Sequence, residues 1–94
     1  MFDIWRAENG HILFSGRLDA SQAEKVRNIL ETITESCTLD FKELDYISSA
    51  GLGVLLGTQK RLSETGYNLK LINLNKHIRD IFIVAGFDFV FDIE

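Results

Sequence analysis

Apolar and polar residues alternate with a period of two at the start of the chain. The alternation covers residues 2–6, a Glu8-Asn9-Gly10 turn signal follows, and residues 11–16 form a second β-prone run. Alternation of this kind is typical of half-buried strands, and Asn-Gly favours a tight turn between two of them. The pattern predicts an N-terminal antiparallel hairpin.

The pattern becomes helical after Asp19, where apolar residues recur at intervals of three and four. The apolar stripe consists of Ala23, Val26, Ile29, Leu30 and Ile33. Charged and polar residues occupy the other face, as in a helix that packs one side on a sheet. Asp19 and Gln22 have the spacing of a capping box, so the helix is predicted over about 19–33 with Asp19 as its cap.

Strand-like and helical segments then alternate to the end of the chain. The β-prone segments are 37–41, with 44–47 leading into the centre of the chain, 67–73 and 87–93; the helical segments are 49–64, ended by Gly66, and 75–85, closed by Gly86. The order is β-β-α-β-α-β-α-β, which implies parallel neighbours joined by right-handed crossovers. We expect a single α/β domain over residues 1–94. Its mixed, mostly parallel sheet would have an antiparallel first hairpin and helices predominantly on one face.

The centre of the chain combines two serines with small residues. Residues 44–56 read Leu-Asp-Tyr-Ile-Ser-Ser-Ala-Gly-Leu-Gly-Val-Leu-Leu, a strand end that turns into a helix. Serine is favoured at an N-cap, so Ser48 or Ser49 is expected at, or just inside, the helix start. Ala50, Gly51 and Gly53 would let another protein or a phosphate approach the backbone closely. A plain helix cap packed on a strand fits the same local pattern.

The rest of this helix has a leucine face and a glycine strip. The leucines expected to face the sheet are Leu52, Leu55, Leu56 and Leu62. Gly53 and Gly57 are four residues apart and lie one above the other, in a strip that begins beside Ser49. Glycine inside a helix costs about 0.5–1 kcal/mol relative to alanine, so the strip indicates close approach of another surface. That surface is either a partner protein or a neighbouring helix of the chain itself.

Composition places the chain among ordinary small globular proteins. It has 94 residues, 46% hydrophobic and 26% charged, with a net charge of −4 and scattered Lys and Arg. The scattered basic residues argue against nucleic acid as a direct partner. The chain shows no apolar segment of membrane-spanning length and no signal-peptide pattern, so we expect a cytoplasmic protein without membrane insertion. Cys37 is the only cysteine, and its apolar surroundings predict a buried thiol.

The candidate chemistry does not indicate an enzyme. A nucleophilic Ser49 would need a base and an oxyanion hole, yet the sequence has only His11 and His77 and no Gly-x-Ser-x-Gly elbow. His11 lies beside the hairpin turn without a second metal ligand nearby in the sequence. We therefore expect no catalysis, no cofactor and no metal site.

Residues 47–55, Ile-Ser-Ser-Ala-Gly-Leu-Gly-Val-Leu, resemble the motif of the STAS domains of bacterial anti-sigma factor antagonists. Gly16-Arg17-Leu18-Asp19 and Leu39-Asp40-Phe41 add to the resemblance, which covers essentially the whole chain. In that family the motif typically reads Asp-Ser-Ser/Thr-Gly-Leu-Gly, and the serine after the aspartate is phosphorylated by an anti-sigma factor that is also a kinase. Matching Gly-Leu-Gly makes Ser49 that serine, with Ser48 in place of the aspartate and Ala50 in place of the second hydroxyl. Asp19 matches an acidic residue near the phosphorylation site.

The resemblance implies a switchable binding protein. The unphosphorylated form would bind an anti-sigma factor with serine kinase activity and so release the sigma factor. Phosphorylation of Ser49, or less readily Ser48, would end binding, and a metal-dependent Ser/Thr phosphatase would restore it. The residues expected to contact the partner are Asp19, Ser48, Ser49, Ala50, Gly51, Gly53 and Gly57.

A second function is compatible with the same fold. Similar short STAS proteins serve as small cytoplasmic subunits of lipid-transport ABC complexes. Many anti-sigma factor antagonists add a C-terminal helix after the position that matches Glu94, so we expect an apolar strip to be less covered in this chain.

Overall fold

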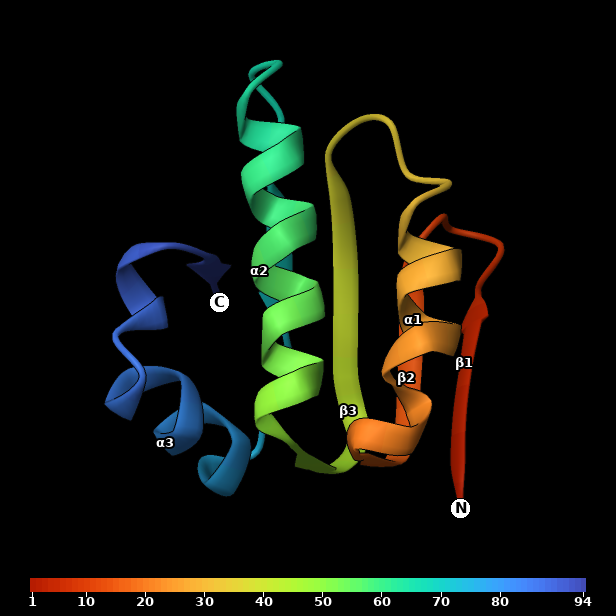
Figure 1. Cartoon of the computed structure of the whole chain (residues 1–94), viewed down its shortest axis with the longest axis vertical. Coiled ribbons are helices and arrows are strands. Elements are labelled where there is room, and N and C mark those ends of the chain that lie inside the picture. Colours follow the sequence, from red (N-terminus) through yellow and green to blue (C-terminus); the bar gives the residue numbers. More distant parts are fainter.

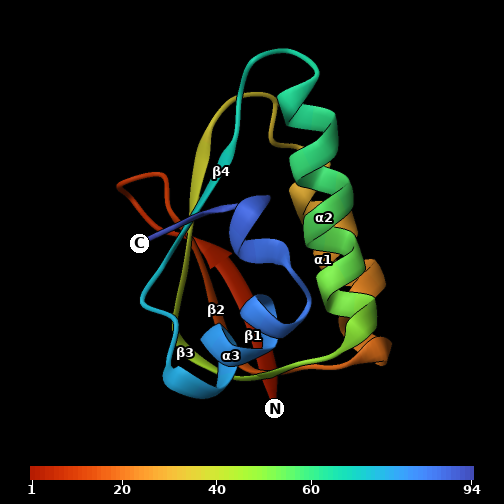
Figure 2. The same cartoon turned by 90° about the vertical axis from the view of Figure 1, so that its left-hand side faces the viewer.

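A five-stranded mixed sheet carries the fold in the computed structural model, which describes residues 1–94. The strands lie in chain order: β1 (Phe2–Arg6), β2 (Ile12–Leu18), β3 (Cys37–Ile47), β4 (Leu69–Ile72) and β5 (Asp92–Ile93). β1 and β2 are antiparallel and every other neighbouring pair is parallel, as predicted. The three α-helices, α1 (Ala23–Leu30), α2 (Ser49–Ser63) and α3 (Lys76–Val84), lie on one face of the sheet (Figures 1 and 2).

β3 is the longest strand, because the segments predicted at 37–41 and 44–47 form one continuous strand of 11 residues. Its pairing with β2 shifts register between Leu13 and Ser15 and again between Gly16 and Arg17. Asn75 ties this strand to α3. Its Nδ2 donates to the Leu44 carbonyl at 3.0 Å, and its Oδ1 accepts from the amide of Ile78 at 2.8 Å. One side chain thus caps α3 and anchors it to the sheet.

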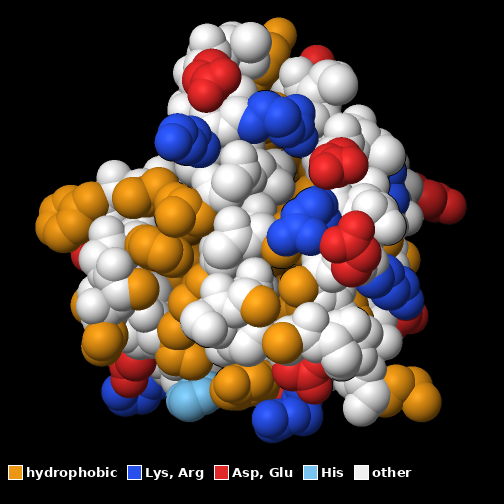
Figure 3. Space-filling model, in the orientation of Figure 1, with side chains coloured by type: hydrophobic (Ala, Val, Ile, Leu, Met, Phe, Trp, Pro, Cys, Tyr) orange, Lys and Arg blue, Asp and Glu red, His pale blue; other side chains and the backbone are white.

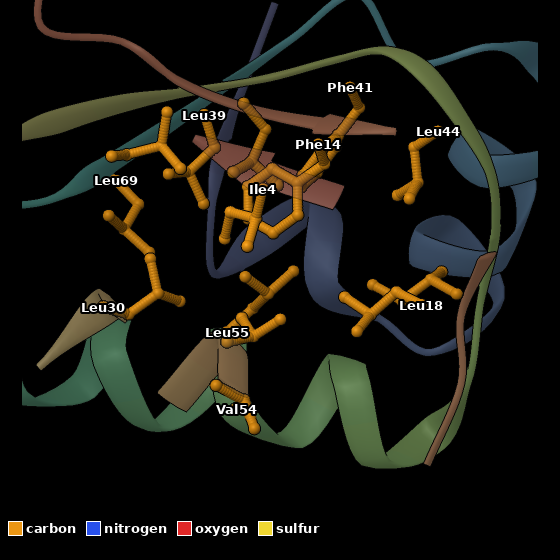
Figure 4. Packing of buried hydrophobic residues seen from close by; sticks show 14 of the residues in the cluster. Ile4, Phe14, Leu18, Leu30, Leu39, Phe41, Leu44, Val54, Leu55 and Leu69 are labelled. Carbon is orange, nitrogen blue, oxygen red and sulfur yellow. The ribbon is translucent and has the colours of Figure 1, made fainter. Parts of the chain in front are cut away.

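The core fills the space between the sheet and the helices. It is one cluster of 21 buried hydrophobic residues. In Figure 4, Leu30 of α1 and Leu55 of α2 point toward the sheet residues around Phe14. The rings of Phe14 and Phe41 meet edge to face, 4.9 Å between centroids, a favoured aromatic geometry. The predicted layering of helices on one face therefore buries a single core.

The start of α1 differs from the prediction. Asp19 caps a 3₁₀ turn over Ala20–Gln22, and its carboxylate accepts from the amide of Ser21 at 3.1 Å. Gln22 precedes α1 without a side-chain capping bond, so the predicted capping box is absent and Asp19 does not cap the α-helix directly. The helix ends at Leu30, three residues early. Arg61 from α2 donates to the carbonyl of Leu30, its last residue, and to that of Ile33 in the loop that follows.

The predicted strand over 87–93 is wrong for most of its length. Phe87–Phe89 form a 3₁₀ turn, η2, and only Asp92–Ile93 pair with β4. Phe87 and Phe91 both pack on Phe82 of α3, at centroid distances of 6.3 and 5.6 Å. A coiled segment brings residues four apart to the same side, whereas a straight strand separates them too far for this contact. Aromatic packing therefore outweighs the alternating pattern.

Coiling of this segment leaves apolar side chains in the solvent. Phe89 is 91% exposed and Val84 is 88% exposed. Figure 3 shows hydrophobic side chains gathered over α3 and η2, on the left of the view.

The face of α2 that meets the sheet also differs from the prediction. Leu55 and Leu62 are buried as expected, but Leu52 and Leu56 lie half-buried at the flank. The remaining buried positions are Gly51, Val54, Thr58 and Gln59. The Gln59 amide accepts from the Leu69 amide at 2.7 Å and donates to the Val90 carbonyl at 3.3 Å. It therefore joins α2 to β4 and to the C-terminal segment.

Gly51 faces the core, in contrast to the exposed position that the sequence predicts. A Cβ atom here would lie 2.8 Å from Leu18 Cγ and 3.0 Å from Ile47 Cγ1. The same test at Gly53 and Gly57 finds no atom within 4 Å. Gly51 thus allows α2 to touch the ends of β2 and β3, while the other two glycines form the outer surface.

Cys37 is half-buried, so the predicted burial of its thiol is only partly realised. Burial raises the pKa of the Cys37 thiol above its ordinary value. Among the helices, none combines the length and the apolar character needed to cross a bilayer.

A pair of glycine substitutions tests the packing of α2. Gly51→Ala should lower the free energy of unfolding by about 1–3 kcal/mol, because the methyl group overlaps Leu18 and Ile47. Gly53→Ala adds the same methyl group on the open side and should raise it by about 0.5–1 kcal/mol. Urea denaturation of both variants measures the difference. Equal effects at the two positions would contradict the close contact at Gly51.

Candidate functional site

The ends of β2 and β3 bring the predicted site residues to one edge of the sheet. Leu18 and Ile47 are register partners, and the amide of Ser48 donates to the Leu18 carbonyl at 2.8 Å. This bond carries the ladder one residue beyond the strand. The chain after β2, which begins with Asp19, therefore leaves the sheet beside the start of α2. This edge lies at the lower end of Figure 1.

The two adjacent serines have different roles at this edge. Ser48 is the N-cap of α2, and its Oγ accepts from the amide of Gly51 at 3.2 Å. Ser49 is the first residue of the helix and is exposed. Ser48 is therefore the cap, and Ser49 lies just inside the helix start, as the sequence predicts.

Two backbone amides at the start of α2 remain available. A helix leaves its first four N–H groups without partners of its own. Here the amide of Ser48 is taken by Leu18 and that of Gly51 by the Ser48 side chain. The amides of Ser49 and Ala50 remain, at the positive end of the helix dipole. An anionic group on Ser49 would lie beside them.

Asp19 is held as a carboxylate on this edge. Its Oδ1 accepts from both the hydroxyl of Ser21, at 2.6 Å, and the amide of Ser21, at 3.1 Å. The side-chain hydrogen bond from Ser21 is the main cause that lowers the pKa of Asp19, and the positive charge of Arg17 adds a smaller effect. The role of Ser21 was not predicted from the sequence, although the Asp-x-Ser spacing is typical of such a turn.

Arg17 and Tyr46 form a second feature that the sequence did not reveal. They are register partners near the ends of β2 and β3, and the Arg17 guanidinium lies 4.3 Å from the centre of the Tyr46 ring. This is within the range of a cation–π contact. The pairing depends on the irregular register between the strands, so sequence spacing alone could not have found it.

The glycine strip of α2, Gly53 and Gly57, faces outward. This is the position that contact with a partner protein requires. Gly53 and Gly57 are exposed and line a hollow of about 540 Å³ between α1 and α2. Its other lining residues are Arg27, Glu31, Val54, Thr58 and Arg61. In Figure 3 the surface over the middle of α2 is largely white, with charged side chains on the α1 side and hydrophobic ones on the α3 side. Packing of the strip under a helix of the same chain is therefore wrong.

A second hollow lies at the opposite end of the sheet. It measures about 520 Å³ and is lined mainly by polar residues, among them Arg6 and His11; Cys37 also borders it. None of the predicted contact residues borders it. No group of three or more His, Cys, Asp and Glu side chains is placed to hold a metal ion. His77 is exposed in the first turn of α3.

A family model described as "Mlab, STAS domain" matches residues 4–91 of this chain. The chain belongs to the STAS domain family. Among named relatives, the anti-sigma-B factor antagonist of Bacillus subtilis is 30% identical over 96 residues, which cover 98% of this STAS domain and 88% of the relative. The anti-sigma-B factor antagonist of Listeria monocytogenes is 32% identical over 87 residues, covering 88% of this chain and 76% of the relative.

Solved structures share the fold of this STAS domain. The unphosphorylated form of the anti-sigma factor antagonist SpoIIAA superposes with a TM-score of 0.73 at 20% identity, covering 100% of this chain and 87% of that one. An anti-sigma factor antagonist from Mycobacterium paratuberculosis gives a TM-score of 0.82 at 15% identity, covering 99% and 83%. The five strands and the helix layer thus follow the STAS arrangement.

The two serines of this STAS domain should differ in their effect on stability. Ser48→Ala removes the N-cap acceptor and should lower the free energy of unfolding by about 0.5–2 kcal/mol. Ser49→Ala changes an exposed side chain and should alter it by no more than about 0.5 kcal/mol. Chemical denaturation of both variants checks this. A larger loss for Ser49→Ala would show that Ser49, and not Ser48, supports the helix start.

Proposed function

We propose that this STAS domain is an anti-sigma factor antagonist controlled by phosphorylation of Ser49. The unphosphorylated protein binds an anti-sigma factor with serine kinase activity, and the sigma factor is released. The observation that carries the proposal is the exposed Ser49 at the start of α2, on the same sheet edge as Asp19. The names of the Bacillus and Listeria relatives support it.

In the proposed reaction, the γ-phosphoryl group of ATP passes to Ser49 Oγ. The bond between the γ-phosphorus and the oxygen of the leaving ADP breaks, and the serine hydroxyl gives its proton to a base of the kinase. The new group adds about −1.5 to −2 charges and three acceptor oxygens. The amides of Ser49 and Ala50 and the helix dipole favour this charge by roughly 0.3–1 kcal/mol at an exposed site. The fold therefore tolerates phosphorylation.

Binding of the partner would respond much more strongly than folding. A dianion in the interface must be desolvated or paired, and an unpaired charge there costs several kcal/mol. Every 1.4 kcal/mol corresponds to a tenfold change in affinity. Phosphorylation at the edge of the contact is therefore sufficient to turn a tight complex into a weak one.

The partner surface in this proposal follows α2 from its first turn. Ser49, Ala50, Gly53 and Gly57 form its contact line, and Asp19 lies at its edge. Ser48 and Gly51 act through the position of the helix, since Ser48 caps it and Gly51 lets it touch the sheet. The two exposed glycines allow the backbone of a partner to approach α2 closely.

Binding also has to be restored after phosphorylation. A metal-dependent Ser/Thr phosphatase returns the protein to its binding form. The protein works in the cytoplasm as a regulatory binding protein without catalytic activity or a cofactor of its own.

Phosphate transfer to Ser49 is the direct test. The anti-sigma factor encoded in the same genome is incubated with this protein and ATP, and the products are analysed by intact mass and phosphopeptide mapping. One phosphoryl group is expected on Ser49. Ser49→Ala should gain none and should bind the anti-sigma factor whether or not ATP is present.

Ser48→Ala is the matched control and should still be phosphorylated. Phosphate on Ser48 alone, or on the Ser49→Ala protein, would contradict the assignment of the acceptor. Stable association with a permease and ATPase pair, without binding to any anti-sigma factor, would instead favour the transport-subunit function.

The glycine strip provides a separate test of the partner surface. Gly57→Gln places a long polar side chain over the hollow and should weaken binding of the anti-sigma factor at least about tenfold. Stability should stay level or rise, because glycine is a poor helix former and no atom lies within 4 Å of a Cβ placed at this position. Ser63→Gln, at the far end of α2, serves as the control. Calorimetric titration and thermal unfolding give both quantities, and unchanged binding in Gly57→Gln would remove the strip from the interface.

A further inference from the structure

We infer that Ser21 is a positioning residue for the phosphoacceptor edge: it fixes the Asp19 carboxylate beside Ser49 so that the kinase can recognise it. The inference rests on the proposed function and assigns a role to a residue outside the family motif. Asp19 would act through a basic side chain of the kinase, and Ser21 would act only through Asp19.

The geometry around Asp19 is specific to this pair of residues. Ser21 contributes both its hydroxyl, at 2.6 Å, and its amide, at 3.1 Å, and both donate to the same oxygen, Oδ1. Two bonds on one oxygen fix the direction of the carboxylate. They also leave Oδ2 outside this arrangement, where it can accept from a partner. A carboxylate is a strong acceptor for Lys or Arg, so the matching group on the kinase is a basic side chain.

The backbone ensures that this carboxylate lies at the phosphoacceptor edge. Asp19 directly follows Leu18, whose carbonyl accepts from the amide of Ser48 at 2.8 Å. Arg17, on the other side of Leu18, is held on the Tyr46 ring. Since Tyr46 engages the nearby guanidinium, Asp19 relies on Ser21 for its orientation.

The charge on Asp19 acts on two steps, recognition by the kinase and release of the phosphorylated product. Before transfer, the fixed carboxylate attracts the basic group of the kinase. After transfer, it faces a phosphoryl group of the same sign, and like charges raise the cost of keeping the product in the interface. The hydrogen bond from Ser21 lowers the pKa of Asp19. An aspartate is already charged at neutral pH, so Ser21 acts on the direction of the carboxylate and not on its charge.

Four variants test this assignment: Ser21→Ala, Ser21→Thr, Asp19→Asn and the double variant Ser21→Ala/Asp19→Asn. The assay is kcat/KM for phosphorylation by the anti-sigma factor and ATP. Ser21→Ala should lower kcat/KM about tenfold, the size expected for one charge-assisted contact. Asp19→Asn should lower it at least as much although asparagine still caps the turn. The double variant should be no slower than Asp19→Asn, because Ser21 acts through Asp19, and Ser21→Thr should restore most of the rate.

A carboxyl-detected NMR titration reports on the hydrogen bond itself, and the rate in the four variants then shows whether this bond acts on phosphorylation. The pKa of Asp19 should rise in Ser21→Ala and return in Ser21→Thr, with Arg17 and the amino terminus as the other charges that act on it. Ser63→Ala, which removes an exposed hydroxyl far from this edge, is the control for rate and stability.

The outcomes separate this inference from the proposed function. Normal phosphorylation of Ser21→Ala, or a loss in the double variant that equals the two single losses combined, overturns the role of Ser21 and leaves the function intact. A wild-type protein that accepts no phosphate overturns both.

Discussion

The first turn of α2 touches the last residues of β2 and β3, so a side chain at position 51 would overlap them. The contact with Leu18 and Ile47 draws the helix start onto the edge of the sheet. The amide of Ser48 then completes the sheet ladder, and its hydroxyl oxygen completes the helix cap. Ser49, the next residue, is left on the outer surface. The exposure of the candidate acceptor is therefore a consequence of how tightly the core is packed beneath it.

Polar side chains secure α2 at further points along its length. Arg61 donates to the carbonyl of Leu30 at the end of α1 and to that of Ile33 in the following loop, and Gln59 joins β4 to the C-terminal segment. A buried polar group that satisfies its partners restrains a structure more than its net contribution to stability suggests. α2 is consequently held in place along its length. A charge added at its start therefore changes the electrostatic potential of the surface without moving the helix.

The sequence was informative where local chemistry and periodicity agree, as at the serine cap and the helix that follows it. The prediction was wrong where the sequence did not show which side of an element faces the core. Gly51 and Gly53 are two residues apart, about 200° around a helix, so they could not both face outward. The strand predicted over 87–93 failed because the contacts of Phe87 and Phe91 with Phe82 depend on α3, which local alternation does not describe. The Asp-x-Ser spacing permits the bonds of Ser21 to Asp19, but the place of this turn beside the start of α2 depends on the pairing of β2 with β3.

The length of β3 separates two ends of the molecule that have little in common. Its 11 residues cover about 30 Å at the usual rise of a strand. Ser49 follows one end, while the Asn9-Gly10 turn lies near the other, where Gly10 has a φ of +87° and open space around it. Exposed turns of this kind accept inserted peptides readily. An affinity handle or fluorescent reporter placed in that turn would immobilise or track the protein while its α2 surface stays free.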